Sequence, residues 1–88
     1  MRPWEADPTA KVARRLGKSP QELDVTNGDP NCPDILELDN GDIAVIGRDL
    51  TSNYKGKLPE GMSIGDDERL VIIPRVTLMS AKQDIPDA

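Results

Sequence analysis

The chain of 88 residues has room for one hydrophobic core, which must be aliphatic because the sequence holds no Phe, one Trp and one Tyr. It contains no His, the side chain most often used as a general base near neutral pH and as a metal ligand, so acid–base and metal sites are disfavoured. The formal net charge is −5, and a single Cys excludes an internal disulfide. No apolar run approaches the roughly 20 residues that span a bilayer. Together these features predict an acidic cytoplasmic protein.

Residues 1–30 are predicted to form a basic N-terminal arm that contains a short helix. Residues 1–18 hold five basic and two acidic groups, whereas residues 19–88 hold six basic and fourteen acidic groups. Asp7 can act as N-cap, Pro8 suits the first helical position, and Gly17 can end the helix. The helix would present a basic row of Lys11, Arg14, Arg15 and Lys18. Such a row suits nucleic acid or an acidic protein, but pairing with the chain's own acidic body is the preferred interpretation.

Two further signals follow the predicted helix. Residues 19–22 read Ser-Pro-Gln-Glu, a capping-box spacing that predicts one turn ending near Val25. Residues 26–33 contain Asn-Gly, Asp-Pro and Cys-Pro steps, which favour turns and extended backbone. We place in this loop the boundary between the arm and a β-rich main body formed by residues 31–88.

Two apolar runs, at residues 34–39 and 42–47, flank a dipeptide suited to a type I′ turn and predict a β-hairpin. With Asn40 and Gly41 as a two-residue loop, Leu38 would face Ile43 and the preceding residues would pair in step. Both faces of this hairpin would be largely apolar. We therefore expect a sheet that is partly covered on both sides, with the N-terminal helix over one of them.

Residues 48–69 are polar, and their apolar side chains are spaced too irregularly for a helix. We predict a long surface loop there, which is either functional or hides another element. Residues 70–73 read as a third, central strand. The segment after Pro74 reads as a short helix that packs on the sheet through a side carrying Val76, Met79 and, less regularly, Leu78. The predicted fold class is α+β: a small antiparallel sheet, made of the hairpin at 34–47 and the strand at 70–73, with short flanking helices at both ends.

No catalytic, cofactor-binding or metal-binding residue is predicted. Counted from Asp24, position twelve of a calcium loop is Ile35, where that loop needs Glu. Cys32 lies close to Asp34, whose charge opposes formation of a reactive thiolate. A partner-binding role is predicted instead for Trp4, Lys11, Arg14, Arg15, Lys18, Tyr54, Lys55 and Lys57. The plainer interpretation is that Trp4 docks the arm on the sheet and that the basic side chains are solvated or paired within the chain.

Several short stretches resemble known proteins. Residues 31–35 (Asn-Cys-Pro-Asp-Ile), residues 41–47 (Gly-Asp-Ile-Ala-Val-Ile-Gly), residues 73–75 (Ile-Pro-Arg) and the Trp-x-x-Asp-Pro opening at 4–8 resemble small uncharacterised acidic proteins of actinobacteria. More distantly, the Cys, the acidic-apolar strand, the Gly turn and the Ala-Val strand resemble the BldB-type small regulatory proteins, which work beside helix-turn-helix regulators. The chain departs from that pattern after Arg48, where a polar excursion follows and no aromatic C-terminal helix is present.

Together these features predict a non-enzymatic protein-interaction module, and the resemblance implies an accessory role beside a transcriptional regulator. The alternative from another class is nucleic-acid binding through the basic N-terminal helix, and the third is a small-ligand or enzymatic role. The expected partner is another protein, no membrane is expected, and open sheet edges would permit a homodimer.

Overall fold

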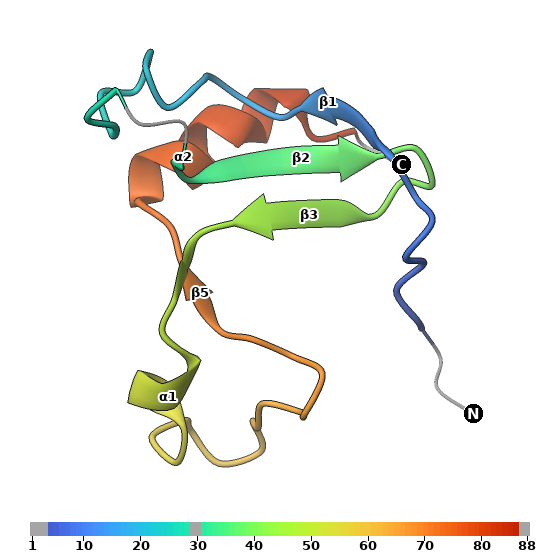
Figure 1. The fold of residues 1–88 in the computed structure, drawn as a ribbon, viewed down its shortest axis with the longest axis vertical. Coiled ribbons are helices and arrows are strands. Elements are labelled where there is room, and N and C mark those ends of the chain that lie inside the picture. Colours follow the sequence, from blue (N-terminus) through green and yellow to red (C-terminus); the bar gives the residue numbers. More distant parts are fainter. Residues whose placement is uncertain (1–3, 29–30, 87–88) are drawn as a thin grey trace.

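The computed structural model describes residues 4–28 and 31–86 of the chain. The described residues exclude 1–3, 29–30 and 87–88. The predicted arm, the predicted loop and the predicted main body each include some of these positions, and that part of each prediction lies outside the described residues. The described part contains two antiparallel sheets and short helices, which confirms the α+β class. In chain order the elements are β1 (Val12–Arg15), β2 (Asp34–Leu38), β3 (Ile43–Ile46), β4 (Arg48–Asp49), α1 (Thr51–Tyr54), β5 (Val71–Ile72), α2 (Arg75–Ala81) and the 3-10 helix η1 (Lys82–Asp84) (Figure 1).

The predicted hairpin is confirmed as β2 and β3, but its register lies one residue away from the prediction. Ile43 faces Glu37, so the predicted pairing of Ile43 with Leu38 is wrong. The turn explains the difference: the N–H of Gly41 donates to the carbonyl of Leu38 at 3.0 Å, and the N–H of Leu38 donates to the carbonyl of Asp42 at 2.9 Å. With φ of 91° at Gly41, the loop has three residues and ends in a left-handed glycine. The one-residue slip changes which side chains share a face.

The predicted helix over residues 7–17 is wrong, because this segment supplies the third strand of the main sheet. One Asp7 carboxylate oxygen accepts from both the N–H and the hydroxyl of Thr9, at 2.9 and 2.6 Å, and forms a tight turn instead of a helix N-cap. After this turn β1 pairs with β2 in the order β1-β2-β3, with an irregularity between Val12 and Arg14.

Strand pairing prevails over the helix for two physical reasons. A helix of about ten residues is marginal unless its apolar stripe docks on something, and this segment offers only Val12 and Leu16 as large apolar side chains. As a strand, the same residues use the free backbone groups of β2 and place Arg14 opposite Glu37. The bulge keeps Leu16 pointing into the core, where it is 2% exposed.

The predicted strand at 70–73 is present as β5, but it does not join the main sheet. It pairs with β4, placing Ile72 opposite Arg48 in a separate two-stranded sheet. Gly47 permits this arrangement, because a Cβ atom there would lie 2.6 Å from the carbonyl oxygen of Ile72. Sequence reasoning missed both β4 and α1. The excursion at 48–69 therefore leaves and returns through paired strands, and α1 lies at the end of the molecule away from the main sheet (Figure 1).

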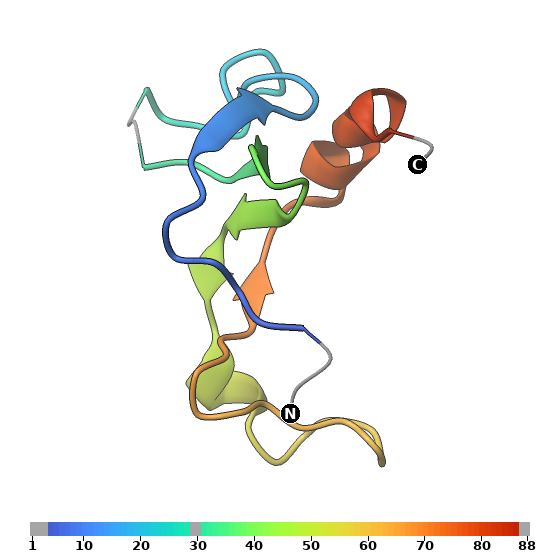
Figure 2. The ribbon, with the colours of Figure 1, turned by 90° about the vertical axis from the view of Figure 1, so that its right-hand side faces the viewer.

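The helix predicted after Pro74 is confirmed as α2, which lies along one face of the main sheet (Figure 2). Its buried residues, Thr77 and Ala81, are four apart and so lie on one side of the helix. Ala81 joins Leu16 and Ile35 in the small buried core. The core thus lies between α2 and the β1–β2 half of the sheet.

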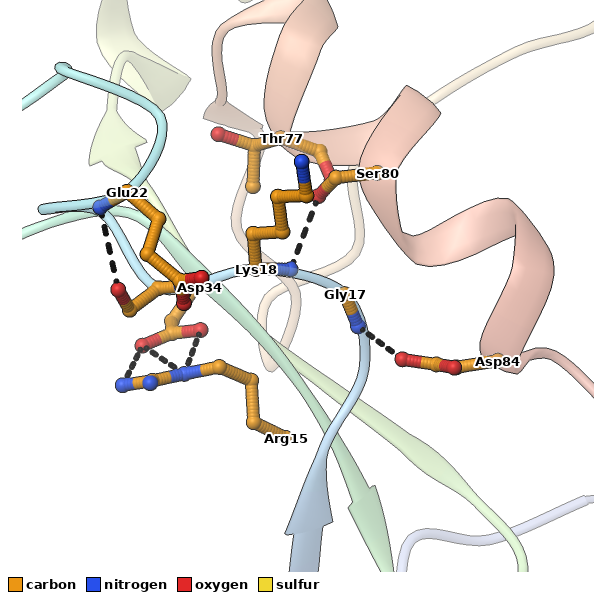
Figure 3. Close-up of polar contacts among 9 residues, drawn as sticks. Arg15, Gly17, Lys18, Glu22, Asp34, Thr77, Ser80 and Asp84 are labelled. Atoms are coloured by element: carbon orange, nitrogen blue, oxygen red, sulfur yellow. Dashed lines mark hydrogen bonds and ion pairs between the residues drawn. The ribbon is translucent and has the colours of Figure 1, made fainter.

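Hydrogen bonds join the chain after β1 to the C-terminal helices (Figure 3). The N–H of Gly17 donates to a carboxylate oxygen of Asp84 at 2.8 Å, and the N–H of Lys18 donates to the hydroxyl of Ser80 at 3.3 Å. The predicted capping box is also confirmed, since Glu22 N–H donates to Ser19 Oγ at 3.2 Å and Ser19 N–H donates back to Glu22 Oε1 at 3.1 Å. One turn follows, as predicted.

Candidate interaction surface

The most prominent surface feature is the amount of large apolar side chain that remains exposed. Among the described residues, only three apolar side chains form the buried cluster. The large apolar residues that are exposed are far more numerous: Trp4, Val12, Ile43, Val45, Ile46, Tyr54, Met62, Ile72, Val76, Leu78, Met79 and Ile85. Contiguous apolar surface on a folded protein is typical of a contact site for another macromolecule.

Helix α2 carries one concentration of this surface. Because Thr77 and Ala81 face the sheet, the opposite side of the helix points to solvent. Met79 lies on that side, and Val76 and Leu78 flank it on either edge; Leu78 and Met79 are each 53% exposed and Val76 is 42% exposed. We call these three residues the outer face of α2. The prediction that the Val76 and Met79 side of this helix packs on the sheet is therefore wrong, because the small residues Thr77 and Ala81 let the helix approach the sheet and take the buried side.

Of the predicted partner-binding residues, Arg14 and Arg15 are engaged within the chain. Arg14 Nε lies 2.9 Å from a carboxylate oxygen of Glu37, and its Nη2 donates to the carbonyl of Asp84 at 2.7 Å. Arg15 donates from two nitrogens to the carboxylate of Asp34 at 2.9 Å (Figure 3). The preferred interpretation of the basic row, intramolecular pairing, is therefore confirmed for both arginines.

The other N-terminal candidates lie at the surface. Lys11 is exposed beside the hairpin turn, where its N–H donates to Asp39 and its carbonyl accepts from the Asp39 N–H. Lys18 is exposed where the chain leaves β1 toward α2. Trp4 donates from its indole N–H to Asp42 at 3.3 Å, yet it stays 62% exposed. The prediction that Trp4 docks on the sheet by burial of its indole is therefore wrong: the ring stays exposed and makes a polar contact at the hairpin end.

Tyr54, Lys55 and Lys57 lie apart from this group, at the far end of the molecule. Tyr54 ends α1, and the N–H groups of Lys55 and Lys57 donate to carbonyls within that turn. All three side chains are exposed. The structure therefore does not bring the two sets of predicted residues onto one surface (Figure 1).

An open cleft separates the N-terminal arm from the excursion. Its lining combines apolar groups, such as Trp4, Met62 and Ile64, with acidic ones, such as Asp67 and Glu68. In residues 4–28 and 31–86 no cluster of three acidic or Cys side chains could hold a metal ion. Within those ranges, no helix has the length and apolar character needed to cross a membrane.

Within residues 4–28 and 31–86, three carboxylates have a pKa below the ordinary range, and each belongs to a local turn. The hydroxyl and N–H of Thr9 lower the pKa of Asp7, and those of Thr51 lower the pKa of Asp49. The N–H and hydroxyl of Ser19 lower the pKa of Glu22. Cys32 is half-buried, and its Sγ–H donates to Thr26 Oγ1 at 2.7 Å. Each of these hydrogen bonds joins residues that are close in the sequence and stabilises a local turn or loop.

Comparison of the chain with protein-family models, with curated proteins and with solved structures finds no match. A function for this chain therefore has to be inferred from its surface chemistry.

Proposed function

We propose that the protein is a non-enzymatic, cytoplasmic protein-interaction module that binds another protein through apolar surface, including the outer face of α2. The observation that carries the proposal is the contrast between a buried cluster of Leu16, Ile35 and Ala81 and the many large apolar side chains that are about half exposed. Binding a partner would remove this apolar area from water, which is the main favourable term in protein association.

The surface chemistry supports a protein partner over nucleic acid. A phosphate backbone is bound by side chains whose positive charge is available, and Arg14 and Arg15 each already pair with a carboxylate. The basic helix on which the nucleic-acid alternative depended is a strand. With a net charge of −5, the whole chain is also repelled by a polyanion.

The resemblance to BldB-type proteins suggests a transcriptional regulator as the partner. A short amphipathic helix with an apolar outer side suits a groove on a second protein, where Leu and Met side chains adapt to the surface that they meet.

The test is in-cell cross-linking of the tagged full chain, followed by reconstitution of the captured pair from purified components. Three forms are compared: the native sequence, Met79→Lys on the outer face of α2, and Met62→Lys on the excursion as the matched control. Both methionines are largely exposed, at 53% and 65%, so either lysine should be tolerated by the fold.

We expect one protein to bind the native chain and Met62→Lys with equal affinity, and to bind Met79→Lys at least about tenfold more weakly, since a buried Met side chain contributes roughly 1.5 to 3 kcal/mol. Capture of the same proteins by all three forms, with equal affinities after purification, would contradict the proposal. So would the absence of any pair that can be reconstituted.

A further inference from the structure

The main sheet has a second face, opposite α2, which no helix covers in the part of the chain that the structure describes (Figure 2). The observed register defines which residues lie there. Leu36 pairs with Ala44, and Leu38 pairs with Val12, so these side chains share one face. By strand alternation Ile46 lies on the same face, whereas the buried Ile35 lies on the face toward α2. We call Val12, Leu36, Leu38, Ala44 and Ile46 the open sheet face.

Side chains from all three strands make this surface continuous. Val12 in β1 is 59% exposed and Ile46 in β3 is 51% exposed, while Leu36, Leu38 and Ala44 between them are half-buried. An antiparallel sheet that turns one face to water normally alternates apolar and polar residues so that its outer face is polar. Here the outer face is apolar at its centre, which is the pattern of a face that packs against another layer.

The total exposed area of the chain is large enough to include a contact with another copy. The chain exposes 7168 Å². A compact monomer of its mass, 9.6 kDa, would expose about 5,100 Å². The radius of gyration, 14.5 Å against roughly 12 Å for a compact chain of this length, shows that an extended shape accounts for part of the surplus. The whole surplus is about 2,000 Å², of which the roughly 800 Å² per partner that a stable dimer interface buries is less than half.

The charges on this face indicate which partner fits it. Arg15 and Asp34 lie on the face and neutralise each other at 2.9 Å. Asp42, at the hairpin end, is bound by the indole N–H of Trp4. The apolar centre itself carries no charge. Two copies of a chain with net charge −5 repel each other least where such a neutral surface faces its own image.

We propose that two copies of the chain associate through their open sheet faces, each three-stranded sheet covering the other across a two-fold axis. A self-complementary apolar patch is what a two-fold interface requires, and packing of two sheets face to face is a standard way to close a core. The exposed Trp4 lies at the rim, where it can extend the contact to the partner copy. The dimer uses a surface different from the outer face of α2 and does not depend on the proposed function.

The test is sedimentation equilibrium of the full chain over about a hundredfold range of concentration, with three single variants. The native protein is expected at about 19 kDa, twice the mass of one chain, and Ile46→Lys at 9.6 kDa. Ile72→Lys in β5 is the matched control, since Ile72 is also an exposed strand isoleucine but lies in the other sheet, and it should remain dimeric. Met79→Lys should also remain dimeric, which separates this result from that of the proposed function.

A second measurement uses only the native sequence and so does not depend on any variant folding. In a sample mixed from isotope-labelled and unlabelled chains, methyl groups of Ile46, Leu36 and Val12 should show contacts between copies. A single-chain mass at every concentration would overturn the inference. A dimer that persists in Ile46→Lys, or contacts between copies that map to α2, would overturn it equally.

Discussion

Arg14 and Glu37 face each other across β1 and β2, and their side chains form an ion pair of 2.9 Å although they are 23 residues apart in the sequence. This pair ties the strand that was predicted as a helix to the centre of the main sheet. The same arginine also donates to the carbonyl of Asp84, which connects β1 to the chain after α2. One side chain thus links three segments of the fold.

We expect Arg14→Ala and Glu37→Ala each to lower the free energy of unfolding by about 1 kcal/mol, the upper range for partly exposed ion pairs. The double variant should lose less than the sum of the two, because the pair is lost only once. Chemical denaturation at one fixed chain concentration measures the free energy of unfolding of the native chain, the two single variants and the double variant. Strictly additive losses would show that the two side chains do not interact.

Gly17 and Gly28 allow backbone strain to be separated from packing. Both have positive φ, 85° and 89°, so alanine is strained at either site by about 1 kcal/mol. A Cβ at Gly17 would also lie 2.7 Å from the backbone nitrogen of Ala81, whereas a Cβ at Gly28 meets nothing within 4 Å. Gly17→Ala should therefore cost about 3 kcal/mol in total and Gly28→Ala about 1 kcal/mol, measured by thermal unfolding. Equal losses would mean that α2 does not pack against Gly17.

Thr77 is expected to be a site where a polar group can be removed with a gain in stability. It is 3% exposed, and its hydroxyl is buried without a hydrogen-bond partner among the described residues. Thr77→Val keeps the shape and removes the unpaired group, so the free energy of unfolding should rise by about 1 kcal/mol. Thr77→Ser, which keeps the hydroxyl and loses a methyl group, should lower it. A loss of stability in Thr77→Val would show that the hydroxyl is paired.

The turn at Asp49 should open in acid. Hydrogen bonds from the hydroxyl and N–H of Thr51, at 2.7 and 3.0 Å, lower the pKa of Asp49 below its ordinary value of 3.8. Because the folded pKa is the lower one, the ionised carboxylate stabilises the fold above the unfolded pKa, and this contribution is lost as the pH falls through the folded pKa. The Thr51 amide resonance should therefore titrate with a midpoint below pH 3.8 and stop titrating there in Asp49→Ala. A midpoint at or above 3.8 in the native chain would contradict the structure.

Local patterns predicted the elements whose signals are contained within a few residues. The β2–β3 hairpin, the Ser19–Glu22 capping box and the helix after Pro74 all depend on nearest-neighbour chemistry, and all three are present. The hairpin register failed because Gly41 closes a three-residue loop, and the same Asn-Gly step is compatible with either loop length.

The candidate surfaces were predicted only in part. The sequence indicated that both faces of the hairpin are apolar. It also predicted that a helix at residues 7–17 covers one of these faces, whereas the structure has the strand β1 there. The predicted partner-binding residues were aromatic and basic, whereas the surface that the structure exposes is mainly aliphatic. Exposure of an aliphatic side chain depends on which segment packs over it, and no local pattern reports that.

The amino-acid sequence by itself determined the α+β class, the aliphatic character of the core and the lack of an imidazole, because these follow from composition and short-range periodicity. Only the tertiary structure decided that residues 12–15 form a strand, that β5 pairs with β4, and that α2 packs on the β1–β2 half of one sheet face and on none of the other. Those outcomes depend on competition between distant segments for the same backbone hydrogen bonds and the same apolar surface. The local sequence around a residue does not determine which distant segment wins that competition.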